Sequence, residues 1–103
     1  MLAAFRLLFL GSFIVAIVPP TFAADSNNGK EIANRWCASC HLVEPGQGSA
    51  TDQAPPFSYL ARTPDFNANK LAFLLLQPHP SMPSVSLRRA EVADMADYIL
   101  SLK

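Results

Sequence analysis

The feature that most constrains this chain is the segment CASCH at residues 37–41, which contains both cysteines of the 103-residue sequence. Two residues separate Cys37 from Cys40, and His41 follows directly. Cysteines at this spacing lie on neighbouring positions of one helical turn, so their sulfur atoms can reach one edge of the same group. The adjacent imidazole is a metal ligand. The segment therefore predicts a site that combines two sulfur atoms with one imidazole.

Three kinds of site use this spacing. A disulfide or thiol-redox pair needs only the two cysteines, but the βαβ context of thioredoxin-like folds is absent. A structural zinc site needs a fourth ligand, and the only other histidine is His79. Cys-x-x-Cys-His is the signature of covalent haem attachment. We therefore expect one haem c, bound through Cys37 and Cys40.

Residues 1–23 are predicted to be a secretory signal peptide. Arg6 supplies the positive start, and the uncharged run from Leu7 to Val18 is shorter than the ~20 residues that a membrane-spanning helix needs. Thr21 and Ala23 are small residues at the −3 and −1 positions of a cleavage site. We expect cleavage after Ala23, a domain over residues 24–103 and a periplasmic location. An uncleaved membrane anchor is the alternative.

The composition of residues 24–103 excludes some function classes. Seven basic and eight acidic side chains remain after Arg6 is removed, so the formal charge is close to −1. No basic stripe is present, which argues against binding to nucleic acid. A domain this small makes a thin core and usually needs a disulfide, a metal or a cofactor to stabilise it. The pattern contains helices and loops, with no strand pair, and predicts an all-α fold.

A haem iron usually takes a second axial ligand, for which the sequence offers three candidates. Met95 lies on the apolar helical stripe of the last segment, so we interpret it as a core residue. Met82 lies in a loop rich in proline, and Pro83 disfavours a helical backbone at Met82. This methionine has no helical face to fill and is the preferred ligand. His79 is the alternative, with a surface position as its simpler interpretation.

Several segments together resemble a small bacterial class I c-type cytochrome. They are GKEIANRWCASCH, APPF, HPSMP and EVADMADYILSLK, which span nearly all of residues 24–103. The resemblance implies three to four helices wrapped around a covalently attached haem. It implies His41 and Met82 as the two iron ligands. It also implies that the carbonyl group of Pro55 accepts a hydrogen bond from the second ring nitrogen of His41, which would orient the ligand.

Three helices and a short helical turn, FSYLAR at residues 57–62, are expected in the domain. Asn28 and Glu31 resemble a capping box at the start of the first. One face of that helix, Gly29, Ile32, Ala33 and Trp36, is expected to cross the last helix near Tyr98. The second runs from a cap at Asn67 to Pro78, although its apolar run at 71–76 also permits a strand. The last covers residues 88–102, with Arg88 in place of the usual cap and Ser86 as an earlier candidate.

Apolar walls around the haem are predicted from large side chains near these motifs. The candidates are Trp36, Phe57, Tyr59, Leu60, Leu71, Leu74, Leu75, Ile99 and Leu102. As cofactor-binding residues we single out Trp36, Phe57 and Tyr59, beside Cys37, Cys40, His41, Pro55 and Met82. The polar tips of Trp36 and Tyr59 can also donate hydrogen bonds to a haem propionate.

Coordination by histidine and methionine leaves no open site for a substrate and favours ferrous iron. We therefore expect a monomeric one-electron carrier, not an enzyme, with no small-molecule substrate. Its partners would be redox proteins of the periplasm or membrane, namely a donor dehydrogenase and an acceptor oxidase or reductase. A dedicated electron-accepting subunit of a periplasmic dehydrogenase is the main alternative. A sensor or peroxidase-like protein and a thiol-redox protein are the others.

Overall fold

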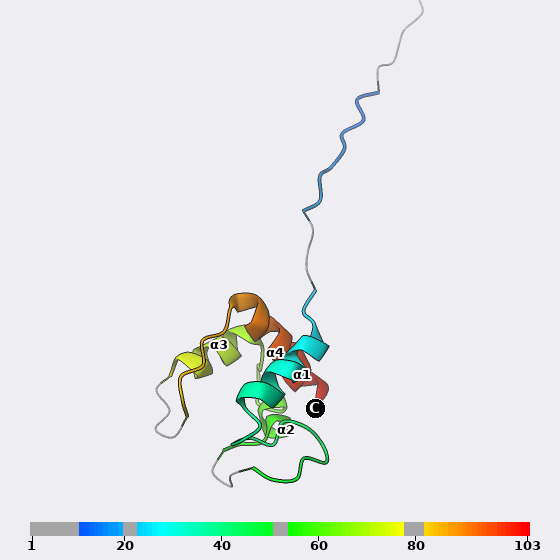
Figure 1. The fold of residues 1–103 in the computed structure, drawn as a ribbon. Helices are drawn as coiled ribbons and strands as arrows, with labels where there is room; N and C mark the ends of the chain where they lie inside the picture. The colour runs from blue at the N-terminus through cyan, green and yellow to red at the C-terminus, as the bar shows by residue number, and fades with distance from the viewer. Residues whose placement is uncertain (1–10, 20–22, 51–53, 78–81) are drawn as a thin grey trace, which may run out of the picture.

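The computed structural model describes residues 11–19, 23–50, 54–77 and 82–103. These residues contain four α-helices and no β-strand, which confirms the predicted all-α fold. The helices are α1 (Ser26–Trp36), α2 (Phe57–Ala61), α3 (Ala68–Leu76) and α4 (Arg89–Ser101). In Figure 1, α1 and α4 cross in the centre of the helical domain, and both α2 and α3 contact α4.

The crossing of α1 and α4 depends on a glycine. A Cβ atom placed on Gly29 would lie 2.1 Å from the backbone oxygen of Asp94 and 2.9 Å from the backbone nitrogen of Met95. Only glycine fits at this distance, so the predicted crossing of the two helices is confirmed. The neighbour of Gly29 is nevertheless the Asp94–Met95 backbone and not the phenol of Tyr98. That phenol donates a hydrogen bond to the backbone oxygen of Val43, at 2.6 Å.

The start of α1 differs from the expected capping box. The helix begins at Ser26, and Asp25 is its N-cap: Asp25 Oδ1 accepts hydrogen bonds from the backbone N–H groups of Asn27 and Asn28. The prediction that Asn28 caps the helix is therefore wrong. The side chain of Asn28 instead donates to Asp94 Oδ2 across the crossing, at 2.7 Å. Asp94 Oδ1 also accepts from the backbone N–H of Asp25, so one carboxylate joins the start of α1 to α4.

The helix α3 agrees with its prediction. Asn67 is the N-cap, and its side chain accepts a hydrogen bond from the backbone N–H of Lys70, at 2.9 Å. The helix continues through Leu76, so the alternative of a strand over residues 71–76 is wrong. Pro78, which was expected to end the helix, lies outside the described residues.

The helix α4 begins without a conventional N-cap side chain. Arg88 occupies the N-cap position, as its place in the sequence predicted, and Ser86 does not. Glu91, three residues later, supplies the hydrogen bond: its carboxylate accepts from the backbone N–H of Arg88 at 2.8 Å and pairs with the guanidinium of Arg88 at 3.2 Å. A guanidinium cannot accept a hydrogen bond, so only the glutamate half of a capping box is present.

The core lies between α4 and the other three helices. Its most completely buried large side chains are those of Met95, Ile99 and Val43. The burial of Met95 agrees with its interpretation as a core residue. Of the predicted apolar walls, Phe57, Leu71 and Ile99 are buried, whereas Leu60, Leu74, Leu75 and Leu102 are partly buried. Trp36 and Tyr59 differ, because 57% and 64% of their surfaces are exposed. Neither belongs to the core that the polypeptide makes by itself, so the buried face predicted for α1 ends at Ala33.

Residues 11–19 have neither helix nor strand and run away from the helical domain in Figure 1. All of them are exposed, including Phe13 and Ile17. In the described part of the chain, no helix has the length and apolar character needed to cross a membrane. The positively charged start of the predicted signal peptide and its Thr21 lie outside the described residues.

Candidate functional site

The CASCH segment continues from the end of α1 as a series of turns. Cys37 is the C-cap of the helix, and its N–H donates to the backbone oxygen of Ala33 at 2.9 Å. The N–H groups of Cys40 and His41 then both donate to the backbone oxygen of Cys37, at 3.1 and 2.9 Å. Both cysteines and the histidine are therefore held on one short, hydrogen-bonded piece of backbone. This is the arrangement that the spacing predicted.

His41 is oriented by a backbone carbonyl. Its Nδ1 atom lies 2.6 Å from the backbone oxygen of Pro55, the contact that the resemblance implied. A carbonyl oxygen can only accept, so this hydrogen bond requires the proton on Nδ1. The lone pair of the neutral ring is then on Nε2, which is the atom left for a metal. The Phe57 ring lies beside the imidazole, with 5.4 Å between the ring centroids.

A backbone hydrogen bond holds Pro55 close to His41. The N–H of Phe57, the first residue of α2, donates to the backbone oxygen of Leu42 at 2.9 Å. This bond connects the residue after His41 to the residue that follows Pro56. The two segments are therefore adjacent at the site, although they are far apart in the sequence.

The two cysteines differ in burial. Cys37 is buried and Cys40 is half-buried. Burial, followed by the neighbouring Cys40, raises the pKa of the Cys37 thiol to about 11. Before it forms a thioether, Cys37 is therefore a neutral thiol at neutral pH, unlike the low-pKa thiolates of redox-active pairs.

The side chain of Gln47 is a feature that sequence reasoning missed. Its Nε2 atom lies within hydrogen-bonding distance of the backbone oxygens of Ala38, His41 and Ser49, at 2.9, 2.8 and 3.3 Å. Its Oε1 atom accepts from the backbone N–H of Val43 at 2.8 Å. One side chain thus contacts backbone groups inside and just after CASCH. The sequence carries only a weak signal for it, a Pro-Gly turn immediately before a long amide.

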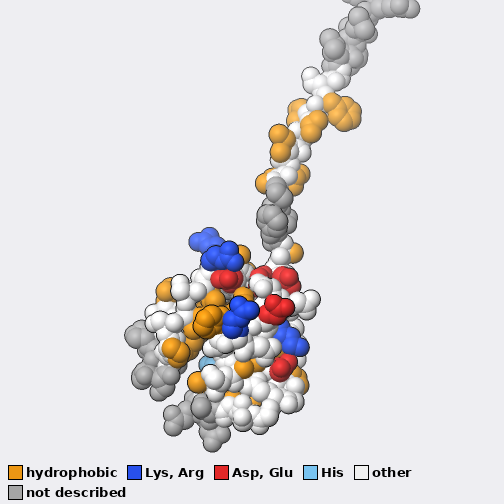
Figure 2. All heavy atoms as spheres, in the orientation of Figure 1, with side chains coloured by type: hydrophobic (Ala, Val, Ile, Leu, Met, Phe, Trp, Pro, Cys, Tyr) orange, Lys and Arg blue, Asp and Glu red, His pale blue; other side chains and the backbone are white. Residues whose placement is uncertain are grey.

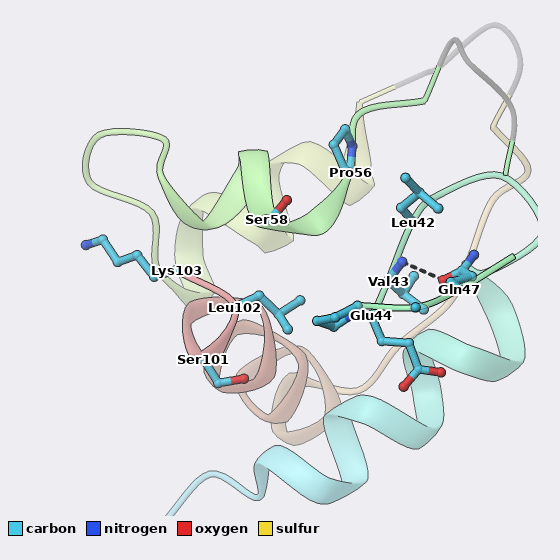
Figure 3. A pocket seen from close by; sticks show the side chains of 11 residues that line it. Leu42, Val43, Glu44, Gln47, Pro56, Ser58, Ser101, Leu102 and Lys103 are labelled. Carbon is cyan, nitrogen blue, oxygen red and sulfur yellow. Dashed lines mark hydrogen bonds between the residues drawn. The ribbon is translucent and has the colours of Figure 1, made fainter. Parts of the chain in front are cut away.

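The loop that carries Gln47 also lines a pocket of about 560 Å³. Figure 3 shows it between the loop at 42–47, Pro56 and Ser58 near the start of α2, and Ser101, Leu102 and Lys103 at the C-terminal end. Neither the two cysteines nor His41 lines it. The pocket is therefore separate from the CASCH site.

The other predicted site residues are less well defined. Met82 is half-buried, and it follows four residues that lie outside the described part of the chain. His79, the alternative ligand, is one of those four. Trp36 is exposed immediately before Cys37, and Tyr59 is exposed in α2. The structure therefore brings together Cys37, Cys40, His41, Pro55 and Phe57.

The donor set fits haem c. The sulfur atoms of Cys37 and Cys40 would bind the vinyl groups, and the His41 imidazole would bind the iron through Nε2. In the described residues no three or more His, Cys, Asp or Glu side chains gather into a metal site of the kind that zinc requires. The family model for cytochrome c matches residues 26–103. The chain belongs to the cytochrome c family. It is a small class I c-type cytochrome with one covalent haem c, attached through Cys37 and Cys40, and its function is electron transfer.

A relative is also similar to the chain over most of the length of both proteins. Cytochrome c-552 of Bradyrhizobium diazoefficiens is 54% identical over 81 residues, which cover 79% of this cytochrome and 78% of the relative. No solved structure shows significant similarity to the chain. Members of the cytochrome c family are in general electron carriers that work with redox protein partners, and not enzymes.

Proposed function

We propose that this cytochrome c is a periplasmic carrier of single electrons between redox proteins, with His41 and Met82 as the axial ligands of its iron. The observation that carries the proposal is the contact between His41 Nδ1 and the Pro55 oxygen. It supports a histidine with its Nε2 atom free and its ring direction fixed, as a permanent ligand requires. Haem c, when bound, supplies an iron that accepts and releases one electron.

The polypeptide contributes a fixed environment. Cys37 and Cys40 are attached to the hydrogen-bonded end of α1, so the site cannot move independently of the crossing of α1 and α4. Met82 would supply a thioether, which favours the ferrous state and raises the reduction potential. Phe57, and the exposed Trp36 and Tyr59, are proposed to contact the haem. With His41 and Met82 both bound to the iron, no coordination position would remain for a substrate. For that reason we propose a carrier and not an enzyme.

Partner proteins are proposed to dock around Cys37 and Cys40, where Ser39 and Trp36 are exposed. Acidic and basic side chains are interspersed on the face shown in Figure 2, next to an apolar patch. The formal charge of the domain is close to −1, so no strong electrostatic field would select the partner. A donor dehydrogenase and an acceptor oxidase or reductase are the proposed partners of a monomeric carrier. Nucleic acids and small-molecule substrates are not among them.

Export is proposed from the sequence of residues 1–23. The apolar run and the small residues before the proposed cleavage site support it. If the leader is removed as proposed, the purified mature protein begins at Ala24, as read by N-terminal sequencing and intact mass. A mature protein that retains residues 1–23 would instead support the membrane-anchor alternative.

A visible spectrum tests the ligands. We expect the ferric protein to show the weak far-red band of methionine ligation, and this band to be lost completely in Met82→Ala. Met95→Ala is the matched control, because it removes a methionine that is buried in α4. It should destabilise the fold by roughly 2–5 kcal/mol and keep the band. If Met82→Ala keeps the band, Met82 is not the ligand and Met95 becomes the candidate. A ferric wild type without the band would make His79 the candidate.

A further inference from the structure

The side chain of Gln47 connects the haem-attachment segment to the loop that follows it. We propose that Gln47 is a positioning residue for the haem site: it fixes the backbone of CASCH so that the His41 imidazole faces the iron in one orientation. This inference rests on the proposed function, because it assumes His41 as an iron ligand. It concerns a residue outside the attachment motif, whose own chemistry is limited to hydrogen bonding.

The contacts use both ends of the amide. Nε2 has two hydrogens to donate and lies 2.9 Å from the backbone oxygen of Ala38 and 2.8 Å from that of His41, with the Ser49 oxygen more distant at 3.3 Å. Oε1 accepts from the Val43 N–H at 2.8 Å. Ala38 lies between the two cysteines, and His41 is the proposed ligand. The amide therefore connects the parts of the backbone that carry the sulfurs and the imidazole.

A tight turn returns Gln47 to this position. The backbone N–H of Gln47 contacts the backbone oxygen of Glu44 at 3.4 Å, and Gly46 has φ = +82°. A positive φ at the third residue, after a proline, is typical of a type II turn, in which glycine is strongly favoured. Figure 3 shows the Gln47 side chain directed at Val43, with their hydrogen bond as a dashed line. The turn thus places the Gln47 amide against the preceding segment, which contains CASCH and Val43.

His41 is consequently held at two points. The hydrogen bond to the Pro55 oxygen fixes the ring through Nδ1, and the bond from Gln47 fixes the main chain of the same residue. Rotation of the ring requires rotation about the side-chain bonds or a shift of the backbone. The hydrogen bond to the Pro55 oxygen opposes rotation about the side-chain bonds. The hydrogen bond from Gln47 opposes a shift of the backbone. Loss of the Gln47 amide should therefore change the angle of the imidazole plane on the haem without preventing its ligation.

Two substitutions separate the two ends of the amide. Gln47→Met keeps the length of the side chain and removes all of its strong hydrogen bonds. Gln47→Glu keeps an acceptor for Val43 but cannot donate to Ala38 or His41. We expect both ferric holoproteins to show haem methyl resonances displaced from those of the wild type, because these NMR shifts depend on the orientation of the axial imidazole. Hydrogen exchange at the Val43 N–H should accelerate roughly tenfold in Gln47→Met and remain near the wild-type rate in Gln47→Glu.

The control is Tyr98→Phe, which removes another hydrogen bond to the same segment, at the Val43 oxygen, without touching CASCH. It should lower stability and leave the methyl shifts unchanged. Intact mass and the absorption spectrum establish that each protein carries covalent haem. Haem-loaded Gln47→Met and Gln47→Glu with wild-type shifts would overturn this inference and leave the proposed function intact. A wild-type protein without covalent haem would overturn both.

Discussion

Several side chains in this cytochrome form hydrogen bonds with backbone groups of segments that are distant in the sequence. The Pro55 oxygen sets the tautomer of His41, and the Gln47 amide serves three carbonyl groups and one N–H. Tyr98 follows the same pattern, with its hydroxyl group donating to Val43. Buried backbone oxygens without a partner are costly, so each of these side chains stabilises a loop that lacks regular structure.

Tyr98 should make stability depend on alkaline pH. Burial, followed by the negative charge of Glu44, raises the pKa of its phenol above the ordinary value of 10.0, and Lys30 partly opposes this. A raised pKa in the folded state means that the unfolded state loses the proton first. The stabilisation is therefore complete below pH 10.0 and is lost as the pH rises through the folded-state pKa.

We expect Tyr98→Phe to cost about 1 kcal/mol of unfolding free energy at neutral pH, from the loss of one hydrogen bond. Above pH 10.0 the difference between variant and wild type should shrink, since ionisation destabilises only the tyrosine form. Denaturant unfolding at a series of pH values measures this. If the difference in unfolding free energy between Tyr98→Phe and the wild type were the same at all pH values, the assigned environment of Tyr98 would be wrong.

At the scale of elements, the fold depends on how closely α1 approaches α4. The small face of α1, with Gly29 and Ala33 buried, permits the approach, and the Asp94 carboxylate then joins the two helices through Asp25 and Asn28. The haem-attachment segment begins at the end of α1. Any shift in this crossing would therefore displace Cys37 and the residues after it.

Gly29→Ala tests the crossing. In a free helix this change stabilises by roughly 0.5–1 kcal/mol, because alanine is the better helix former. Here the new Cβ would lie 2.1 Å from the Asp94 oxygen, which requires the helices to separate. We expect a net loss of roughly 1–3 kcal/mol in thermal or denaturant unfolding.

Gly48→Ala is the matched control for this substitution. No atom lies within 4 Å of a Cβ at Gly48, and the residue does not have a positive φ. Its stability should stay within about 0.5 kcal/mol of the wild type. Equal effects of the two substitutions would show that the close approach of α1 to α4 does not matter for stability.

At the scale of the whole molecule, the polypeptide core is small. Helices of 5 to 13 residues surround a small number of fully buried side chains. Several large apolar residues of the helical domain remain exposed, such as Trp36, Tyr59 and Phe73. A domain of this length buries too little apolar surface to be stable with a wide margin. The haem should therefore contribute a large share of the folding free energy.

Removal of the haem tests this dependence. The double variant Cys37→Ser with Cys40→Ser cannot form thioethers, and we expect it to lose most of its helical circular dichroism and its cooperative thermal transition. The wild type matured in the same host is the reference. A double variant that contains no haem and unfolds at the wild-type midpoint would show that the polypeptide core is sufficient.

Local patterns in the sequence were enough for several of these features. The spacing of Cys37, Cys40 and His41 predicts the haem site, and Asn67 with the apolar run after it predicts α3, because the groups involved are a few residues apart. Met95 is buried where its helical stripe places it. The Pro55 contact was available only through the resemblance to a family, since no local pattern relates residues 41 and 55.

The sequence alone determined the all-α class, the cofactor and its attachment, since helical periodicity and covalent chemistry depend on neighbouring residues. Other features were decided by the tertiary structure. The sequence did not show that Asn28 bonds to Asp94, 66 positions away, and that α1 consequently begins at a different cap. Nor did it show that Gln47 turns back onto CASCH. These contacts form only when separate segments pack together, because a side chain then satisfies whichever backbone or carboxylate group lies nearest in space.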